Sequence, residues 1–483
     1  MTTVPDLTHP SQAPDRMPLL IAAGVFSALS LAAAIASDGF LEADACTHYM
    51  FARFALGEPH YLVNIWGRPL VTGLYAIPAA TVGLMGVRAT SLLLALLCAY
   101  LTYRIARDLG MRRPQLAFIF VLAQPLLFLH SFSELTELPF AALVAAMFLA
   151  YVRQRWIWLA ILAALGPLCR PEGFGFLLLA VAALVWHRRP WHLLILPLGL
   201  LGWSIAGRLV HGPEDGVYWY NWLIVHWPYS PQSPYGRGWP WHFLIRLPTV
   251  VSPLVFPFMW IGLWRCATRH GQEAHPGGKC APVFFLVGLI PMLVLAGHSF
   301  LWWRGLMASN GELRYMLVVA PFWALLSAEG WAWAFDRMNW RRPILWAGVA
   351  ALVPILANRA YPCVPVRMVD NDRLAQQVAQ WYRADEQLQR RYPRVMAAHS
   401  GVYYHLDVSQ SDRRRSVQWK RSNVDGRPPG TLLIWDPISG PYNSDAELCV
   451  TREHIIEAGW QPLRQWDKGW EAFVSDPEPS PTR

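Results

Sequence analysis

The sequence predicts a polytopic α-helical membrane protein with a small soluble α/β domain at its C-terminal end, on three observations. The chain has 483 residues, of which 54% are hydrophobic and only 15% are charged, whereas soluble proteins usually carry about 25% charged residues. Eleven apolar stretches approach the length that crosses a bilayer. Charged residues become frequent after position 358. This composition excludes a disordered chain and a disulfide scaffold, and it disfavours an ordinary cytosolic enzyme.

The charge distribution predicts where the domains begin and end. Residues 359–483 hold 17 Lys and Arg and 16 Asp and Glu, whereas residues 1–358 hold 24 and 16 and carry most of the net charge of +9. Basic residues at the cytoplasmic ends of membrane helices explain this excess, so no nucleic-acid partner is expected. We expect a disordered cytoplasmic N-terminus at 1–16, a transmembrane catalytic domain at 17–358 and an extracytoplasmic soluble domain at 359–483.

The membrane helices are predicted from apolar runs. The segment 69–87 is also apolar. Basic residues favour the cytoplasmic side of a membrane, and the chain has five basic clusters between its apolar runs. All five lie on the same side as the N-terminus only if the segment 69–87 does not cross the membrane but lies in its interface. We therefore expect an integral membrane protein, in the inner or plasma membrane if it is bacterial, with a cytoplasmic N-terminus. The eleven expected spans are 17–36, 88–106, 114–132, 138–152, 155–169, 173–187, 191–208, 249–265, 282–298, 315–335 and 343–358.

The first external segment, 37–68, is rich in ionisable residues. It includes Glu42, Asp44, His48 and Arg68. Residues 44–56 have helical spacing, which predicts an interfacial helix with a carboxylate at its N-terminal end. A solvated loop in which Asp44 is only an N-cap is the alternative.

Two further external segments carry charged residues close to helix ends. Glu134 and Glu137 lie three residues apart at the start of a span, where they would share one helix face and suit the helix dipole. Arg170 and Glu172 flank Pro171, whose ring fixes a turn. The two charged residues indicate either a functional site or a turn with a local ion pair. Ionisable groups at a membrane boundary are often functional.

The last two external segments combine aromatic and basic residues. Residues 218–243 contain ten aromatic residues, which form either an aromatic belt at the interface or a flap over a lipid chain or sugar ring. The segment 299–315 contains Arg304, Arg314 and Tyr315. An arginine fork binds phosphate in a bidentate manner, although such residues also serve as interfacial anchors.

One face of the membrane therefore presents carboxylates and arginines together. This combination favours group transfer from a phosphate-bearing lipid. Arginines would neutralise the phosphate leaving group, and a carboxylate would take the proton from an acceptor hydroxyl.

The order of these motifs resembles the polytopic GT-C glycosyltransferases. The similarity is greatest to the branch with protein O-mannosyltransferases and lipid A aminoarabinose transferases, and it extends over about residues 1–335. The chain departs from that pattern at Ala45, which replaces a second acid, at Arg68, where Lys is usual, and at Leu70, where Pro is usual. The matching runs are DACTH at 44–48, FARFALG at 51–57, GRPL at 67–70, TELP at 136–139 and GELRY at 311–315.

The resemblance implies roles for individual residues. Asp44 would be the general base, Glu137 a second acid, and Arg68, Arg170 and Arg314 the ligands of the donor phosphate. His48 either orients Asp44 or simply forms a hydrogen bond in the interface. The other candidate substrate-binding residues are Glu42, Glu134, Glu172, Arg304 and Tyr315.

The expected reaction moves a sugar, with inversion, from a polyprenyl-phosphate donor to an acceptor hydroxyl on a lipid, a glycan or a protein outside the cytoplasm. No metal is required, although the Glu42-x-Asp44 spacing leaves open a divalent-metal mode similar to that of oligosaccharyltransferase relatives. A transporter or flippase of lipid-linked glycans, or a polymerase or ligase of them, is the alternative. A further alternative is a non-catalytic scaffold. The sequence indicates neither the sugar nor the acceptor.

Overall fold

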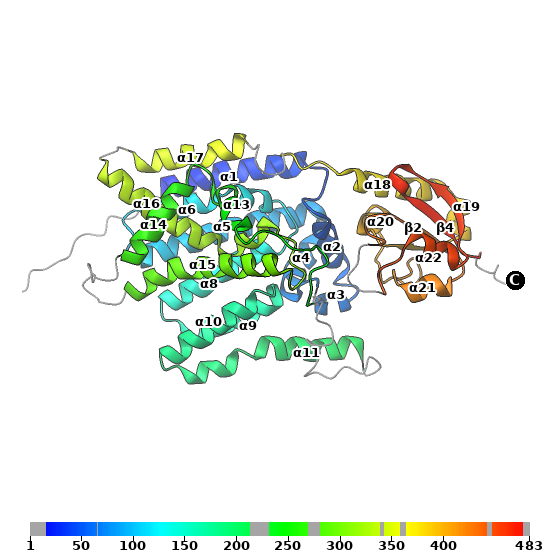
Figure 1. Cartoon of the computed structure of the whole chain (residues 1–483), viewed down its shortest axis with the longest axis horizontal. Helices are drawn as coiled ribbons and strands as arrows, with labels where there is room; N and C mark the ends of the chain where they lie inside the picture. Colours follow the sequence, from blue (N-terminus) through cyan, green and yellow to red (C-terminus); the bar gives the residue numbers. More distant parts are fainter. Residues whose placement is uncertain are drawn as a thin grey trace, which may run out of the picture.

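The computed structural model describes residues 16–64, 66–212, 231–268, 281–338, 342–357, 364–441 and 447–476. It has a large helical bundle and, beyond one end of the bundle, a smaller unit that contains a β-sheet (Figure 1).

The bundle accounts for all eleven apolar stretches, because each of them is helical in the structure. By length and composition, five of the described helices can cross a membrane, or six if one bent pair counts as a single span. The chain is thus an integral membrane protein with shorter helices packed between the long ones, and a count of eleven spans stays a prediction. The helices of the bundle, after α1 (Met17–Ala36), are α5 (Leu84–Asp108), α6 (Pro114–Leu122), α7 (Pro125–His130), α8 (Glu137–Val152), α9 (Trp156–Cys169), α10 (Gly173–Trp186), η1 (Pro190–Ile195), α11 (Leu198–His211), α13 (His242–Val251), α14 (Phe256–Thr268), α15 (Ala281–Arg304), η4 (Leu313–Val319), α16 (Ala320–Arg337) and α17 (Pro343–Ala357).

Two of the expected continuous spans are wrong in detail, because proline divides each into two helices. The stretch 114–132 breaks at Gln124, which is extended (φ −72°, ψ 118°) before Pro125. The stretch 249–265 breaks at Ser252, which has a φ of 95° and precedes Pro253, and α13 and α14 meet there at 109°. In both places the proline ring keeps the preceding residue out of the helical conformation.

Three short helices lie between α1 and α5: α2 (Ala43–Phe54), α3 (His60–Val63) and α4 (Pro69–Thr81). The structure confirms the helix expected from residue 44 onward. It also separates α4 from α5 at Gly83, which has a φ of 78°. A helix of 13 residues is about 20 Å long and is shorter than the roughly 30 Å hydrocarbon core, which agrees with an interfacial position.

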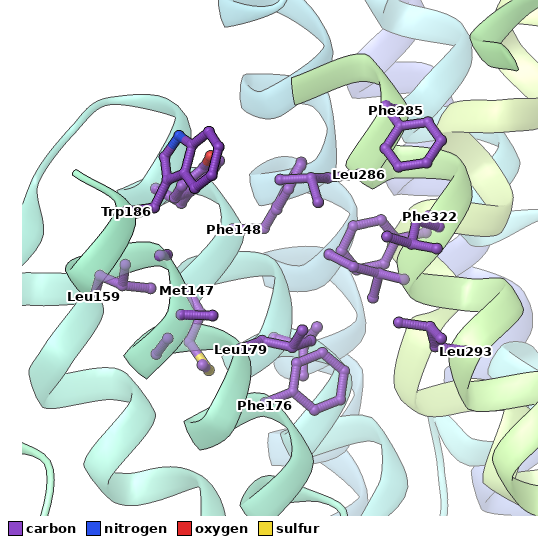
Figure 2. Close-up of a pocket in the computed structure, with 17 residues that line it drawn as sticks. Met147, Phe148, Leu159, Phe176, Leu179, Trp186, Phe285, Leu286, Leu293 and Phe322 are labelled. Atoms are coloured by element: carbon purple, nitrogen blue, oxygen red, sulfur yellow. The ribbon is translucent and has the colours of Figure 1, made fainter. Parts of the chain in front are cut away.

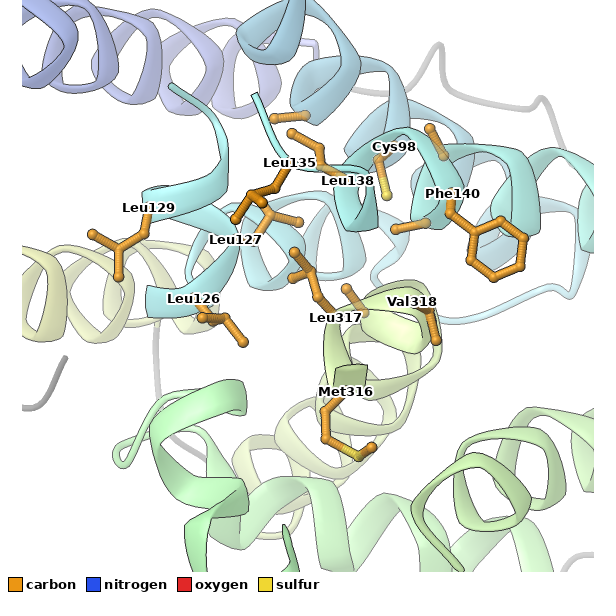
Figure 3. Close-up of a cluster of buried hydrophobic side chains, with 14 of the residues drawn as sticks. Cys98, Leu126, Leu127, Leu129, Leu135, Leu138, Phe140, Met316, Leu317 and Val318 are labelled. Carbon is orange, nitrogen blue, oxygen red and sulfur yellow. The ribbon is translucent and has the colours of Figure 1, made fainter. Parts of the chain in front are cut away.

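The core of the bundle surrounds α16, which is buried along most of its length. Near the end of the bundle where η4 begins, leucines of α7 and α8 pack against Met316, Leu317 and Val318 of η4 (Figure 3). Helix α16 also packs against α14 with glycine at the contact. A Cβ atom on Gly262 or Gly330 would overlap a backbone carbonyl of the facing helix, so the two backbones touch there. Small residues permit this close approach between membrane helices.

The smaller unit has a four-stranded sheet in the order β1-β2-β4-β3. β1 and β2 are parallel, whereas β4 is antiparallel to β2 and to β3. β2 is fully buried and the edge strand β3 is exposed. The elements are α18 (Asp370–Ala384), α19 (Glu386–Arg391), β1 (Arg394–Ala397), α20 (Ser400–Leu406), α21 (Arg421–Gly426), β2 (Thr431–Trp435), α22 (Arg452–Glu457), β3 (Gln461–Gln465), η5 (Asp467–Gly469) and β4 (Glu471–Val474).

Small polar side chains attach this sheet unit to α2 and α3. Thr47 of α2 donates a hydrogen bond to Ser400 over 3.0 Å. Ser409 donates to Glu58 over 2.8 Å, and the hydroxyls of Ser409 and Tyr61 lie 3.0 Å apart. The position of α2, which carries Asp44, is therefore set from the bundle on one side and from the sheet unit on the other.

Candidate active site at one end of the bundle

A buried arginine, Arg314, collects the carboxylates of three separate segments. Its Nη1 lies 2.8 Å from Glu42 and its Nη2 lies 2.7 Å from Asp44. Its Nε faces Glu137 at 3.5 Å and also forms an ion pair with Glu312. The structure thus brings together predicted residues that are up to 272 positions apart in the sequence, because η4, α2 and α8 all begin at this face of the bundle.

Glu137 joins two buried arginines. Its Oε1 lies 2.5 Å from Nη1 of Arg170, which also donates to Thr136 over 2.7 Å. Arg170 in turn forms a bidentate pair with Glu172, at 3.1 and 2.9 Å. Only 2% of the Glu137 side chain is exposed, and a carboxylate is stable there because both neighbours are cationic.

The turn that holds Arg170 is tightly packed. Arg170 follows the last residue of α9, and α10 begins three residues later at Gly173. A Cβ atom on Gly173 would overlap the backbone of Gly166 in α9. Only glycine therefore lets α9 and α10 approach closely enough to hold Arg170 beside Glu137.

Asp44 is the most accessible acid of the cluster. It lies in the first turn of α2, where the helix dipole favours a negative charge. Its side chain is 41% exposed, compared with 23% for Glu42 and 27% for Glu312. Asp44 can therefore meet a solvent-side hydroxyl while Arg314 holds it from behind.

Burial changes the protonation of the neighbouring acids. It raises the pKa of Glu42 to about 8 against the attraction of Arg314, and repulsion from Glu312 and Glu137 adds to this effect. Burial also raises the pKa of Glu312. Near pH 7 the cluster therefore holds a proton on Glu42, which reduces the negative charge around Arg314.

His48 and Arg68 line the inner side of α2. The His48 ring stacks on Trp66 with centroids 4.8 Å apart, and its buried Nδ1 forms no hydrogen bond with any residue that the structure describes. Burial lowers its pKa to about 4, so the ring is neutral near pH 7. Arg68 is buried, with Arg170, Glu172 and Glu137 near enough to influence it, and burial lowers its pKa to about 10.

Two predicted residues lie apart from the cluster. Glu134 does not share a helix face with Glu137, because α8 begins only at Glu137. Glu134 instead pairs with the buried Arg88 at 3.1 Å. Arg304 ends α15, where its guanidinium lies 5.7 Å from the Trp303 ring in an exposed position.

Tyr315 lies beside the arginines, and sequence reasoning missed two residues that hold it. Its ring centroid is 5.9 Å from the Arg170 guanidinium and stacks on His298 at 4.9 Å. Its hydroxyl donates to Asn310 over 2.6 Å. His298 could have been found, because it is an ionisable residue within an apolar stretch. Of the aromatic segment 218–243, residues 218–230 lie outside the described part of the chain.

An apolar cavity of about 550 Å³ lies in the bundle below the cluster. Figure 2 shows that its walls are leucine and aromatic side chains, among them Phe148, Phe176 and Phe322. Phe176 follows Glu172 by one helical turn, and Val144 follows Glu137 by about 10 Å of helix. The nearest residues of the cavity wall therefore follow Glu172 and Glu137 by about one and two helical turns.

The carboxylates of the cluster surround a guanidinium, which already takes up their charge. Within the described ranges, no group of three or more His, Cys, Asp and Glu side chains has an arrangement that could hold a metal ion.

Comparison with solved structures identifies the architecture. The chain is similar to ArnT from Cupriavidus metallidurans in the apo state, with a TM-score of 0.62 and 12% identity over 95% of this chain and 98% of that chain. It is similar to the same protein bound to undecaprenyl phosphate, with a TM-score of 0.64, 12% identity and the same coverage. The fold is that of the GT-C glycosyltransferases.

A third structure of this GT-C fold is arabinofuranosyltransferase AftD from Mycobacteria, with a TM-score of 0.52 and 15% identity. The match covers 96% of this chain and 40% of that chain. No protein-family model and no curated protein sequence matches the chain.

Proposed function

We propose that this GT-C chain is a membrane glycosyltransferase that moves a sugar from a polyprenyl-phosphate donor to an acceptor hydroxyl on the extracytoplasmic face. One observation carries the proposal. The accessible carboxylate of Asp44 is 2.7 Å from the buried Arg314, in a bundle that also holds an apolar cavity. The similar ArnT structure with bound undecaprenyl phosphate supports a polyprenyl donor.

The arginines provide the site for the donor phosphate. Arg170 and Arg314 flank Glu137, which holds both guanidinium groups in place before the lipid arrives. A phosphate between them would compete with Asp44 for Arg314 and release the carboxylate. The proton that Glu42 retains near neutral pH offsets part of the charge that the phosphate brings.

Asp44 then acts as the general base. It takes the proton of the acceptor hydroxyl as the hydroxyl oxygen forms a bond to the anomeric carbon. The bond between that carbon and the phosphate oxygen breaks on the opposite side, and the lipid phosphate leaves with both electrons. Attack from the opposite side inverts the anomeric centre, and the arginines stabilise the charge that develops on the phosphate.

The orientation of the chain follows from the same proposal. Residues 17–358 would form the catalytic membrane domain and residues 359–483 an extracytoplasmic domain, since the sheet unit contacts α2 on the side of Asp44. The N-terminus would then be cytoplasmic. Because the carboxyl oxygens of Glu42 and Asp44 lie 2.8 and 2.7 Å from the Arg314 guanidinium, we propose that no divalent metal is required.

The test measures sugar release from a panel of polyprenyl-phosphate sugars by the purified chain, with and without a chelator. We expect Asp44→Asn to lose at least about 100-fold in turnover, the range for a general base. Asp38→Asn is the matched control, because Asp38 is an exposed acid of the same segment that pairs with Arg367.

Full turnover by Asp44→Asn would overturn the assignment of the base. Donor binding without turnover in any preparation, together with movement of the lipid across a bilayer, would favour a flippase. Loss of activity with the chelator would contradict the metal-free mechanism.

A further inference from the structure

A polar pocket of about 540 Å³ lies on the other side of α2. We call it the α2–α20 pocket. It is an open pocket lined by the C-terminal half of α2, the turn between α4 and α5, and helices α18 and α20 of the sheet unit. The residues that matter for its chemistry are Tyr49, Arg53, Arg383, Tyr404, His405 and Asp407.

The α2–α20 pocket is distinct from the arginine cluster. Asp44 and Arg53 are nine residues apart on one helix, which corresponds to about 900° of rotation and about 13 Å along the axis. The two side chains therefore leave opposite faces of α2. A ligand atom in the pocket cannot reach Asp44.

The floor of the pocket adjoins the start of a candidate membrane span. Thr81, Val82 and Gly83 line it and directly precede Leu84, where a candidate membrane span begins. Val82 is 67% exposed, and Ile77 of α4 is 64% exposed. Exposed apolar side chains therefore border the pocket on its membrane side, whereas the walls from α18 and α20 are polar.

The pocket carries one cation without an ionic partner. Arg53 is already fixed, because it donates to the carbonyls of Ala79 and Ala80 at 3.2 Å each and lies 3.6 Å from Asp407. The Arg383 guanidinium forms no ion pair or hydrogen bond with any described residue. Burial lowers the pKa of His405 to about 4, and Arg383 adds to this effect, so His405 contributes no charge near pH 7.

Two hydroxyl groups in the pocket are also available. Tyr49 and Tyr404 pack edge to face, with ring centroids 5.7 Å apart. Neither hydroxyl forms a hydrogen bond within the described part of the chain. A guanidinium and two phenols suit an anionic group with several oxygen atoms.

We propose that the α2–α20 pocket binds the phosphate-bearing headgroup of an anionic membrane lipid. Arg383 pairs with the phosphate, and the hydroxyls of Tyr49 and Tyr404 donate to its oxygens. The acyl chains lie beside Val82 and the exposed face of α4. The bound headgroup connects α2 to the sheet unit, and this proposal does not depend on the transferase reaction.

The test is isothermal titration of the purified full chain in a neutral detergent. The probes are dihexanoyl phosphatidylglycerol, dihexanoyl phosphatidylcholine and glycerol 1-phosphate. We expect saturable binding of the anionic lipid, weakened about tenfold in Arg383→Gln and about fivefold in Tyr404→Phe. Arg373→Gln should bind as the wild type does, because Arg373 is an exposed arginine of the same helix that pairs with Asp370.

Three results would overturn the proposal. Equal affinity for phosphatidylcholine would show that charge is not recognised. Glycerol phosphate binding as tightly as the lipid would make a free phosphate the ligand. An Arg373→Gln variant as weak as Arg383→Gln would show that general surface charge, and not this pocket, attracts the lipid.

Discussion

Replacing Arg88 by Met should destabilise the chain more than any comparable change on α5. Arg88 is only 4% exposed. Its guanidinium connects the end of α1 to the loop before α8. It also holds the segment that follows α1, which leads to Glu42 and Asp44. Its four partners are the carbonyls of Ala34 at 2.9 Å, Ser37 at 3.0 Å and Gly39 at 2.8 Å, and the carboxylate of Glu134 at 3.1 Å.

The magnitude follows from what the substitution leaves behind. Met occupies most of the volume, so the cost is mainly electrostatic. Glu134, whose side chain is 1% exposed, loses its cation, and removing one partner of a buried pair costs about 3–5 kcal/mol. We expect a loss of about 4 kcal/mol in the free energy of unfolding. The double variant Arg88→Met/Glu134→Leu should recover about 2 kcal/mol of it, because only the unpaired carbonyls remain.

The assay is equilibrium unfolding in one detergent, followed by circular dichroism. Arg104→Met on the same helix is the control, since among the described residues the Arg104 guanidinium donates a hydrogen bond to Tyr100 alone, at 2.7 Å. That variant should stay within about 0.5 kcal/mol of the wild type. The reasoning is refuted if Arg88→Met is as stable as the control, or if the double variant is less stable than the single one.

Two further predictions concern the site. Because burial raises the Glu42 pKa from 4.5 to about 8, the folded chain binds the extra proton between these values, and its stability should fall as pH rises through this window. Glu42→Gln should flatten this dependence in unfolding measured from pH 5 to 9; an unchanged slope would assign it to another group. Leu293→Trp, which fills the cavity, should raise KM about tenfold for a long-chain polyprenyl donor and leave a short-chain analogue unaffected. A similar rise for both would place the lipid chain elsewhere.

The sequence predicted the helices better than their breaks. Helix α2 was predictable from its spacing, and the apolar spans from their length. The breaks at Pro125 and Pro253 carried a local signal that hydropathy alone overlooks. The shared face expected for Glu134 and Glu137 was wrong because only Glu137 lies in the helix.

The pairing of the site residues had no local signal at all. Arg314 and Asp44 meet because η4 and α2 converge at one face of the bundle, which depends on how more than ten helices pack. Arg88 is a similar case. As a lone arginine in an apolar stretch it attracts attention, but its three carbonyl partners follow from the path of the chain after α1.

The glycine contacts between helices make the supports of the two arginines more rigid than the support of Asp44. Arg314 leads into α16, whose backbone touches α14 at Gly262 and Gly330, and Arg170 follows α9, whose backbone touches α10 at Gly173. Helices in backbone contact cannot slide past one another without steric overlap, so both arginines stand on rigid supports. Asp44, by contrast, lies on a short helix, α2, which is attached to the sheet unit by hydroxyl contacts such as the hydrogen bond from Thr47 to Ser400. We therefore expect that any shift of Asp44 during the proposed transfer brings the acid toward fixed cations, and that the sheet unit shifts with α2.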